Sequence, residues 1–355
     1  MYRILAINPG STSTKIAVYE DETSILLQTI RHSAEELNVF STVEEQYEFR
    51  KQLILQTLAE NNISLSDFSA IVGRGGLLRP IASGTYDVNE EMLHDLRTAI
   101  YGEHASNLGG IIAHSIAKEI PACHAFIVDP VVVDEMQDVA RISGLPQIPR
   151  RSAFHALNQK AVARKYAAQK GVSYEQLNLV IAHLGGGISV SAHRAGKVID
   201  TNQALGGFGA FSPERAGTLD VDAVVEMCFS GKYTKAQIKK MLVGEGGVMA
   251  YLGTNHVGEA LAMAKNGNPT AKLITEAMSY NIAKEIGSML VVLENRADAV
   301  ILTGGIAYNQ PITDEIKRLL NGLADVIVMP GEEEMEALTM GGLRVLKGEA
   351  TSKVY

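Results

Sequence analysis

Residues 8–15, with the sequence NPGSTSTK, combine backbone and side chains that commonly bind phosphate. Apolar runs flank this segment, Ile4–Ile7 before it and Ile16–Tyr19 after it. The pattern predicts a β-hairpin with a small, hydroxylated and basic tip, which can bring N–H groups and an ammonium close to a phosphate. The segment is not a P-loop, because it lacks G-x-x-x-x-G-K-[ST] and no helix follows its glycine. The side chains expected to contact phosphate are Ser11, Ser13 and Lys15.

Two further glycine turns occur later in the chain. The triplet at 185–187 separates two expected strands, Leu179–Leu184 and Ile188–His193. A third turn at 303–305 (TGG) follows a strand and precedes a helix, and flat glycine backbone there can lie against a purine or a ribose. We therefore expect nucleotide contacts from Gly185, Gly186, Gly187, Gly304 and Gly305.

The first two turns belong to halves of the chain that repeat one plan. Ile4–Ala17 and Val180–Ala192 each read as an apolar strand, a turn rich in glycine or serine, and a second strand. Internal duplication of this kind predicts two related domains facing each other across a cleft, with both hairpin tips at the phosphates of one nucleotide. We expect the first domain to contain residues 1–150 and about 331–355, and the second to contain residues 151–330.

Apolar periodicity and turn residues locate the elements that must hold these turns. A helix is expected over Val43–Glu60. Asn268-Pro269 predicts the start of a long helix that runs to about Glu294, because proline is favoured at the first helical position. The other expected helices are Asn89–Tyr101, Asn107–Glu119, His155–Lys170, Asp222–Phe229, Lys235–Leu242, Thr313–Asn321 and Glu333–Lys347. The other expected strands are Ala70–Val72, Ala125–Val128, Lys197–Thr201, Ala299–Thr303 and Val326–Met329.

Composition narrows the class of protein. The chain has 355 residues and is 46% hydrophobic, which is enough for two domains with full cores. Its net charge of −8 and its lack of a long basic run argue against nucleic acid as a partner. We expect neither a signal peptide nor a membrane span. Cys123 and Cys228 fit no metal or disulfide pattern and are expected as buried free thiols of a cytoplasmic protein.

At the level of these segments, the chain resembles the acetokinase family, within the superfamily of acetate and sugar kinases, Hsp70 and actin. Residues 8–15 and 183–190 (HLGGGISV) are similar to the family's two signatures, and residues 150–155 (RRSAFH) to a third segment. The resemblance covers the whole chain. It implies a duplicated two-domain α/β fold with ribonuclease H-like domains and a central cleft. Residues 73–80 (GRGGLLRP) and 330–338 (PGEEEMEAL) resemble the butyrate kinases of this family.

The implied activity is an in-line phosphoryl transfer assisted by Mg²⁺. Butyrate, or a branched short-chain acid such as isobutyrate, would react with ATP to give the acyl phosphate and ADP. An acetate or propionate kinase is an alternative. A second alternative is a non-enzymatic nucleotide switch of the Hsp70 or actin type. The family also implies a homo-oligomer, a dimer or larger.

The resemblance assigns catalytic roles to Arg215, His155 and Asp129, and it places His183 among the residues that bind the nucleotide. Arg215 matches the family's transition-state arginine, whose planar fork suits phosphoryl oxygens. His155 matches the histidine beside the transferred phosphoryl group, and His183 stands next to the glycine turn. Asp129 ends an expected buried strand, where a carboxylate is costly unless it is used, and the resemblance places it near Mg²⁺ or the acyl oxygen.

The metal and the carboxylate are assigned to three further residues. Asn8 and Glu334 match the pair that the family associates with Mg²⁺. Acetate kinases carry an arginine before a V-V-H-G-G run, but here Ile71 occupies the arginine position and Arg74 the histidine position. We infer that Arg74, or alternatively Arg79, binds the substrate carboxylate.

Two other departures concern selectivity. Near the adenine the family has an acid and then an arginine two residues on, whereas this chain has His256 and Gly258. Acetate-specific members narrow the acyl site with a proline near the Gly206-Gly207 position. We hypothesise that Gly206 makes room for acids of four or five carbons, since a missing bulky group changes the preference between such acids by about 1–3 kcal/mol.

Overall fold

The computed structural model describes all 355 residues, which form two compact units. The first comprises Met1–Val133 and Glu333–Tyr355, and the second comprises Asp134–Glu332. The first unit thus ends before the boundary expected at residue 150. The segment from 134 to 150 bonds to the second unit instead, where the backbone N–H of Gln137 donates to the carbonyl of Ile199 at 3.0 Å.

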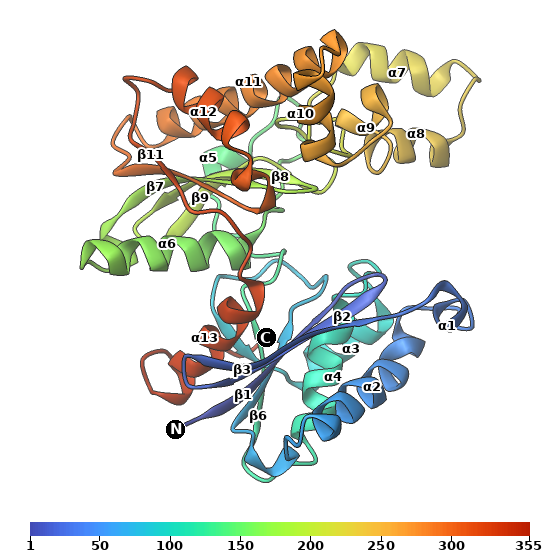
Figure 1. Cartoon of the computed structure of the whole chain (residues 1–355), viewed down its shortest axis with the longest axis vertical. Coiled ribbons are helices and arrows are strands. Elements are labelled where there is room, and N and C mark those ends of the chain that lie inside the picture. Colours follow the sequence, from blue (N-terminus) through green and yellow to red (C-terminus); the bar gives the residue numbers. More distant parts are fainter. The chain divides into compact units, whose positions relative to one another are not determined.

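The first unit contains a six-stranded sheet in the order β3-β2-β1-β4-β6-β5. β1 and β2 form an antiparallel hairpin, and β4 and β6 continue the sheet parallel to β1 (Figure 1). Its strands are β1 (Arg3–Pro9), β2 (Ser13–Glu20), β3 (Thr23–Arg31), β4 (Ala70–Arg74), β5 (Thr85–Asp87) and β6 (His124–Val128).

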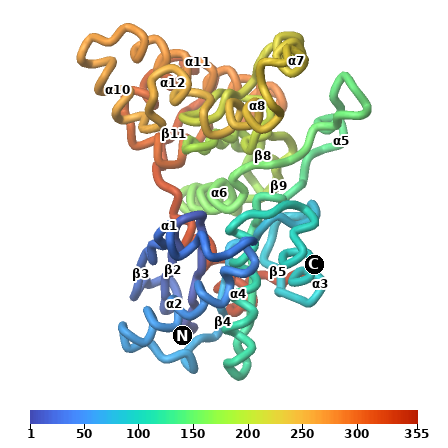
Figure 2. Tube along the Cα trace, turned by 90° about the vertical axis from the view of Figure 1, so that its right-hand side faces the viewer, coloured from blue at the N-terminus to red at the C-terminus, as the bar shows by residue number.

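Helices cover both faces of this sheet. α4 (Asn107–Ala117) packs on one face and α13 (Glu334–Leu346) on the other (Figure 1). Glycines permit this close approach, because a Cβ at Gly109 would collide with the carbonyl of Arg74 and one at Gly341 with the side chain of Val128. The C-terminus lies beside β5 and α3 (Figure 2), and Tyr355 Oη donates to Asp95 there at 2.7 Å. The remaining helices are α1 (Ala34–Leu37), α2 (Tyr47–Glu60) and α3 (Glu90–Thr98), with 3₁₀ turns at Glu44–Gln46 and Leu65–Asp67.

The second unit contains a five-stranded sheet in the order β11-β10-β7-β8-β9. α11 (Pro269–Val292) packs against β7, β8 and β9 within the main core of this unit, and α6 (Ala156–Lys170) packs against β7. The strands are β7 (Asn178–Leu184), β8 (Ile188–Arg194), β9 (Lys197–Thr201), β10 (Ala299–Thr303) and β11 (Val326–Val328). The remaining helices are α5 (Asp138–Arg141), α7 (Val221–Phe229), α8 (Lys235–Leu242), α9 (Gly247–Leu252), α10 (Val257–Lys265) and α12 (Gln310–Leu319), with 3₁₀ turns at Tyr174–Gln176 and Gly305–Tyr308.

The two sheets repeat one topology, as the sequence predicts. The order β3-β2-β1-β4-β6 in the first unit corresponds to β9-β8-β7-β10-β11 in the second. In both, the first three strands pair antiparallel, and the two strands on the other side of the first strand (β4 and β6, or β10 and β11) run parallel to it. The prediction of a duplicated α/β fold is confirmed.

The structure confirms some of the expected helix boundaries and changes others. The start of α11 is confirmed, since the Asn268 side chain accepts from the backbone N–H of Ala271 at 3.0 Å. α3 ends earlier than expected, because Ala99 adopts a left-handed conformation (φ 52°). α9 and α10 were not expected from the sequence.

The two cysteines differ from the prediction. Cys228 is exposed and Cys123 is half-buried, so the prediction of two buried thiols is wrong; burial raises the pKa of the Cys123 thiol to about 11. None of the helices is both long and apolar enough to cross a membrane.

Candidate active site

The tip of the β1–β2 hairpin presents the predicted phosphate-binding residues. The backbone N–H of Gly10 donates to the carbonyl of Ser13 at 2.7 Å, which closes the turn. Asn8 and Lys15 are direct cross-strand partners, so their side chains lie on one face of the hairpin. Ser11 and Lys15 are exposed and Ser13 is half-buried, so all three are accessible to a ligand.

A buried arginine that the sequence analysis did not predict as functional holds the turn of this hairpin through its backbone carbonyls. Arg50, on α2, is only 1% exposed, and its guanidinium donates to the carbonyls of Gly10 (2.8 Å), Ser13 (3.1 Å) and Ser11 (3.2 Å). Burial lowers its pKa to about 10, so the group stays charged near neutral pH. By engaging three carbonyl oxygens on one side, Arg50 fixes the turn that carries the hydroxyls and N–H groups.

Asn8, Arg74 and Glu334 form one polar cluster in the first unit. Asn8 Nδ2 donates to Glu334 Oε2, at the start of α13. Arg74 Nη1 lies 3.2 Å from Asn8 Oδ1 and 3.1 Å from Glu334 Oε1. These three residues are far apart in the sequence. Asn8 and Glu334 were predicted as a metal pair and Arg74 as a carboxylate clamp, and the cluster brings them together.

Two other predicted residues of the first unit have different partners. Arg79 forms an ion pair with Glu91 at 2.5 Å and lies 4.1 Å above the ring of Tyr355. Of the two arginines left open by the sequence, Arg74 is therefore the one beside Asn8. Asp129 is buried at the end of β6 with φ 39°, and its Oδ1 accepts from Ser83 Oγ (2.6 Å) and from the N–H of Gly84 (2.8 Å).

The glycine turn of the second unit is docked against the loop that carries Arg215. The backbone N–H of Gly185 donates to the carbonyl of Gly187 at 3.1 Å. Ser212 Oγ donates to the carbonyl of Gly186 at 2.6 Å. A Cβ at Gly187 would overlap the guanidinium of Arg215, so glycine is needed at this position for the arginine to lie there.

Arg215 is half-buried and has one buried donor atom that is not used. Its Nη1 donates to the carbonyl of Ala204, whereas its Nε is buried and has no hydrogen-bond partner. Burial lowers the pKa of this guanidinium, and the neighbouring Glu214 partly opposes that shift. A buried donor without a partner is unusual in proteins and is available for an oxygen of a ligand.

The two predicted histidines lie against each other. The rings of His155, at the N-terminus of α6, and His183, near the end of β7, are stacked with centroids 3.8 Å apart and an interplanar angle of 13°. Asn158 Nδ2 donates to two backbone carbonyls, those of Gly331 and Glu332, so its Oδ1 faces His183 Nδ1 as an acceptor at 2.8 Å. His183 Nδ1 therefore carries a proton. Its Nε2 lies 3.6 Å from Glu332 Oε1.

A pocket of about 480 Å³ lies beside the glycine turn, entirely within the second unit. Its volume is in the range of small-molecule sites. Gly304 has φ 88°, which residues with a side chain rarely adopt, and a Cβ there would collide with the carbonyl of Leu184, whereas a Cβ at Gly305 would enter open space. The lining residues are Gly185, Gly186, Pro213, Glu214, Asn255, His256, Val257, Gly258, Glu259, Gly305, Ile306, Asn309 and Glu332. The turn at 185–187, the turn at 303–305 and the two residues expected near the adenine therefore each contribute to one pocket.

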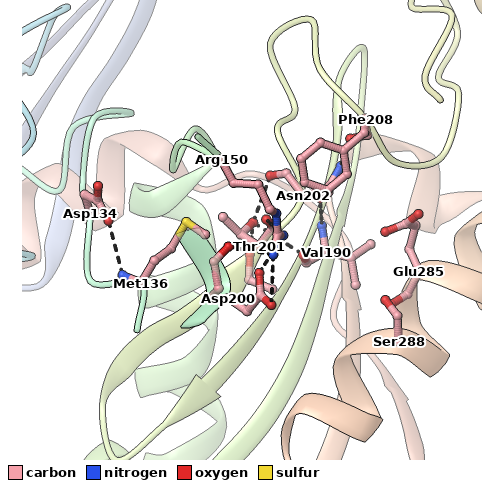
Figure 3. Close-up of polar contacts among 12 residues, drawn as sticks. Asp134, Met136, Arg150, Val190, Asp200, Thr201, Asn202, Phe208, Glu285 and Ser288 are labelled. Carbon is pink, nitrogen blue, oxygen red and sulfur yellow. Dashed lines mark hydrogen bonds and ion pairs between the residues drawn. The ribbon is translucent and has the colours of Figure 1, made fainter. Parts of the chain in front are cut away.

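Arg150, from the RRSAFH segment, holds neighbouring parts of the second unit together (Figure 3). Its guanidinium pairs with Asp200 at 2.7 Å, donates to the carbonyl of Thr201 at 3.0 Å and lies 4.8 Å from the ring centroid of Phe208. It thus ties the loop containing Phe208 to the end of β9. Gly206, in the same loop, lines a cavity of about 20 Å³ together with Arg215, which is too small in this structure for a four-carbon acid.

The donor atoms for a metal are few. The chain has no group of three or more His, Cys, Asp or Glu residues that could hold a metal ion. Asn8 and Glu334 offer one amide and one carboxylate oxygen in the first unit. This set fits Mg²⁺ only if phosphate and water supply the other ligands, which is how Mg²⁺ usually binds with nucleotides.

Comparison with known proteins gives consistent relatives. The sequence model of the acetokinase family matches residues 112–353. Butyrate kinase 2 of Clostridium acetobutylicum is 54% identical over 354 residues, an alignment that covers 100% of this chain and 99% of that protein. A propionate kinase from Francisella tularensis superposes with a TM-score of 0.76 at 22% identity, over 96% of this chain and 99% of that one. An acetate kinase of Porphyromonas gingivalis superposes with a TM-score of 0.77 at 18% identity, again over 96% and 99%. At these identities the two structures establish the fold.

Proposed function

Because the chain belongs to the acetokinase family, whose kinases use ATP, we propose that it is a butyrate kinase. It would transfer the γ-phosphoryl group of ATP to butyrate, or to a branched acid such as isobutyrate, giving the acyl phosphate and ADP. The identity of 54% along the whole chain to a butyrate kinase is the single observation that carries this substrate. The site geometry supports the reaction class.

The substrate needs little activation. A short fatty acid has a pKa close to that of glutamate, roughly 4.3, and is already ionised at neutral pH. A general base is therefore unnecessary, and catalysis consists of positioning the reactants and neutralising charge during an in-line transfer. The described residues fit this task, since they are mainly cations, imidazoles and backbone donors.

In the second unit, the pocket beside the glycine turn would hold the nucleotide. Gly185 and Gly186 would contact phosphate, and Gly305 the nucleoside. The unused Nε of Arg215 would donate to an oxygen of the transferred phosphoryl group as charge develops on it. His155 would donate a second hydrogen bond there.

In the first unit, Arg74 would hold the substrate carboxylate. Its guanidinium already lies against a carboxylate, that of Glu334, at 3.1 Å. Asn8 Oδ1 and Glu334 would hold Mg²⁺, which when bound with ATP neutralises phosphate charge. Ser11, Ser13 and Lys15 would contact phosphate from the hairpin tip.

Trapping the acyl phosphate with hydroxylamine tests this proposal. Purified protein with ATP and Mg²⁺ is given butyrate, isobutyrate, propionate or acetate, and kcat/KM is measured for each as hydroxamate. Butyrate or isobutyrate should give the highest value. A best substrate of acetate or propionate would establish the alternative kinase, and nucleotide binding without hydroxamate from any acid would favour a nucleotide switch.

A further inference from the structure

One face of β8 is polar although it lies in the interior of the second unit. Ser189, Ser191 and His193 occupy alternate positions along this strand, and each is 0% exposed. The residues between them are apolar and join the main core. Burying polar side chains costs free energy unless each is hydrogen-bonded, so a polar face in this place calls for an explanation beyond packing.

Gln159, on α6, links two of these residues. Its Nε2 donates to the backbone carbonyl of Ser189 at 3.1 Å and to Ser189 Oγ at 2.8 Å. A carbonyl oxygen can only accept, which fixes the orientation of the Gln159 amide. Its Oε1 then faces His193 Nε2 at 2.9 Å, so that nitrogen carries a proton. His193 Nδ1 consequently accepts from Tyr174 Oη at 2.6 Å.

The hydroxyl of Ser189 then has one direction left in which to donate. Its oxygen accepts from Gln159 Nε2 at 2.8 Å and from the backbone N–H of His155 at 3.4 Å, which uses both lone pairs. The remaining contact, to His155 Nδ1 at 2.8 Å, must therefore use the hydroxyl hydrogen. His155 Nδ1 accepts, and in the neutral ring the proton lies on Nε2.

The buried side chains thus form one directed chain of hydrogen bonds. It runs from Tyr174 to His193, on to Gln159 and Ser189, and ends at His155. These hydrogen bonds hold His155 in the tautomer opposite to that of its stacked neighbour His183, whose proton lies on Nδ1. Without Ser189 the His155 ring would lose this preference.

We propose that Ser189 and Gln159, backed by His193 and Tyr174, are positioning residues that fix His155 as an Nε2–H donor toward the transferred phosphoryl group. This inference rests on the proposed function for the identity of the group that receives the hydrogen bond. The tautomer itself does not depend on that function. A donor fixed before the substrate arrives needs no reorganisation during the reaction.

The environment of His193 supports a neutral, directional chain. Burial lowers the pKa of His193 well below its ordinary value, and the charges of Lys160 and Arg164 lower it further. Lys160 is itself held by Glu135 at 2.6 Å and by the carbonyl of Gly196 at 2.8 Å. A neutral His193 can accept from Tyr174 while donating to Gln159, which a protonated ring could not do.

The tautomer can be observed directly by ¹⁵N NMR of the protein labelled at histidine, with the His155 signals assigned from a His155→Asn variant. The wild-type protein without ligands should show His155 protonated at Nε2 and unprotonated at Nδ1. In Ser189→Ala the two tautomers should mix. Ser191→Ala is the matched control, because it removes a buried hydroxyl from the same face of β8 that bonds Thr201 at 2.8 Å instead. It should leave the His155 signals unchanged.

Kinetics add the functional half of the test. Ser189→Ala should lower kcat for acyl phosphate formation about 10-fold, with the KM for ATP within about 2-fold, because the donor is misdirected while the nucleotide pocket is intact. Ser191→Ala should keep the wild-type kcat. A wild-type His155 protonated at Nδ1, or equal losses of kcat in the two serine variants, would overturn the proposal; the first result needs no variant to fold. Absence of acyl phosphate formation by the wild-type protein would refute the proposed function, while the NMR comparison would still decide the tautomer.

Discussion

Arg215 is the residue on which the proposed chemistry depends most. Its side chain is half-buried, its Nε is buried without a partner, and its guanidinium lies against Gly187. Arg215→Lys should lower kcat for acyl phosphate formation by about 1,000-fold, because an ammonium keeps the charge but loses the planar fork. Steady-state kinetics by the hydroxamate method measure this loss.

The control for Arg215→Lys is the same change at Arg318. Arg318 is exposed and pairs only with Glu315, at 2.7 Å on the same helix, so Arg318→Lys should keep full activity. Circular dichroism should give the same helical signal for both variants. If Arg215→Lys kept more than a tenth of the activity, the transition-state role would be refuted.

In the first unit, Glu334 is the residue on which the proposed metal binding depends most. It contacts Asn8 and Arg74, whereas its neighbour Glu332 belongs to the second unit and lies near His183. Glu334→Gln should raise the Mg²⁺ concentration for half-maximal activity by about 10-fold, because an amide replaces the only carboxylate of the proposed donor set. A Mg²⁺ titration at saturating ATP and acid measures this.

The matched control for Glu334 is two residues further along the same helix. Glu336 is exposed, and its charge is felt by Tyr19, whose pKa is raised mainly by burial and also by Glu336. Glu336→Gln should leave the Mg²⁺ dependence unchanged. An equal shift in both variants would show that the effect comes from general charge rather than from metal binding.

At the scale of elements, the two neighbouring glycines in the turn after β10 have different roles: Gly304 is needed for the backbone conformation, and Gly305 lines the pocket. Gly304→Ala should lower the free energy of unfolding by about 2 kcal/mol, because φ 88° is strained for alanine and its Cβ would collide with the carbonyl of Leu184. Gly305→Ala should change the stability by less than about 0.5 kcal/mol, since its Cβ meets open space, but should raise the KM for ATP. Urea unfolding and kinetics of the two variants check this pair, and equal stabilities would contradict it.

The same scale shows what could be predicted from sequence. The hairpins, glycine turns and α11 carry local signals, such as apolar runs and Asn268 before Pro269, and these were located correctly. Arg50 carried no such signal, because an arginine in an amphipathic helix is normally solvated. Only the folded chain brings the carbonyls of the β1–β2 turn against it.

For the whole molecule, the duplication in the sequence made the fold predictable. The contacts that support the site in each of the two copies could not be predicted in this way. Both halves repeat the strand, turn and strand pattern, and both sheets follow one topology. The first copy supports its turn with Arg50, and the second with Ser212, which donates to the carbonyl of Gly186. These differences arise from contacts between elements distant in sequence, which periodicity cannot reveal. The grouping of Asn8, Arg74 and Glu334 required the resemblance to a known family and then the folded chain.

Each unit also buries a histidine whose titration should make the molecule sensitive to acid. Burial lowers the pKa of His32 in the first unit, and the nearby Arg50 lowers it further. Burial likewise lowers the pKa of His193 in the second. Below about pH 6.5 the unfolded chain therefore binds protons that the folded chain does not, so stability falls as the pH falls. Each histidine contributes up to about 1.4 kcal/mol per pH unit in that window.

Urea unfolding between about pH 5 and pH 7 measures this loss, and His32→Gln separates one contribution. The His32 Nδ1 atom is buried without a partner, while its Nε2 contacts Thr14 Oγ1 at 2.9 Å. The variant should lower the slope of stability against pH below about pH 6.5 by about 1 kcal/mol per unit, because a glutamine takes up no proton on unfolding. His94→Gln, a change at an exposed position, serves as the control and should leave the slope as in the wild type. A slope that His32→Gln leaves unchanged would mean that His32 is not protonated on unfolding, and that the acid sensitivity of the first unit has another source.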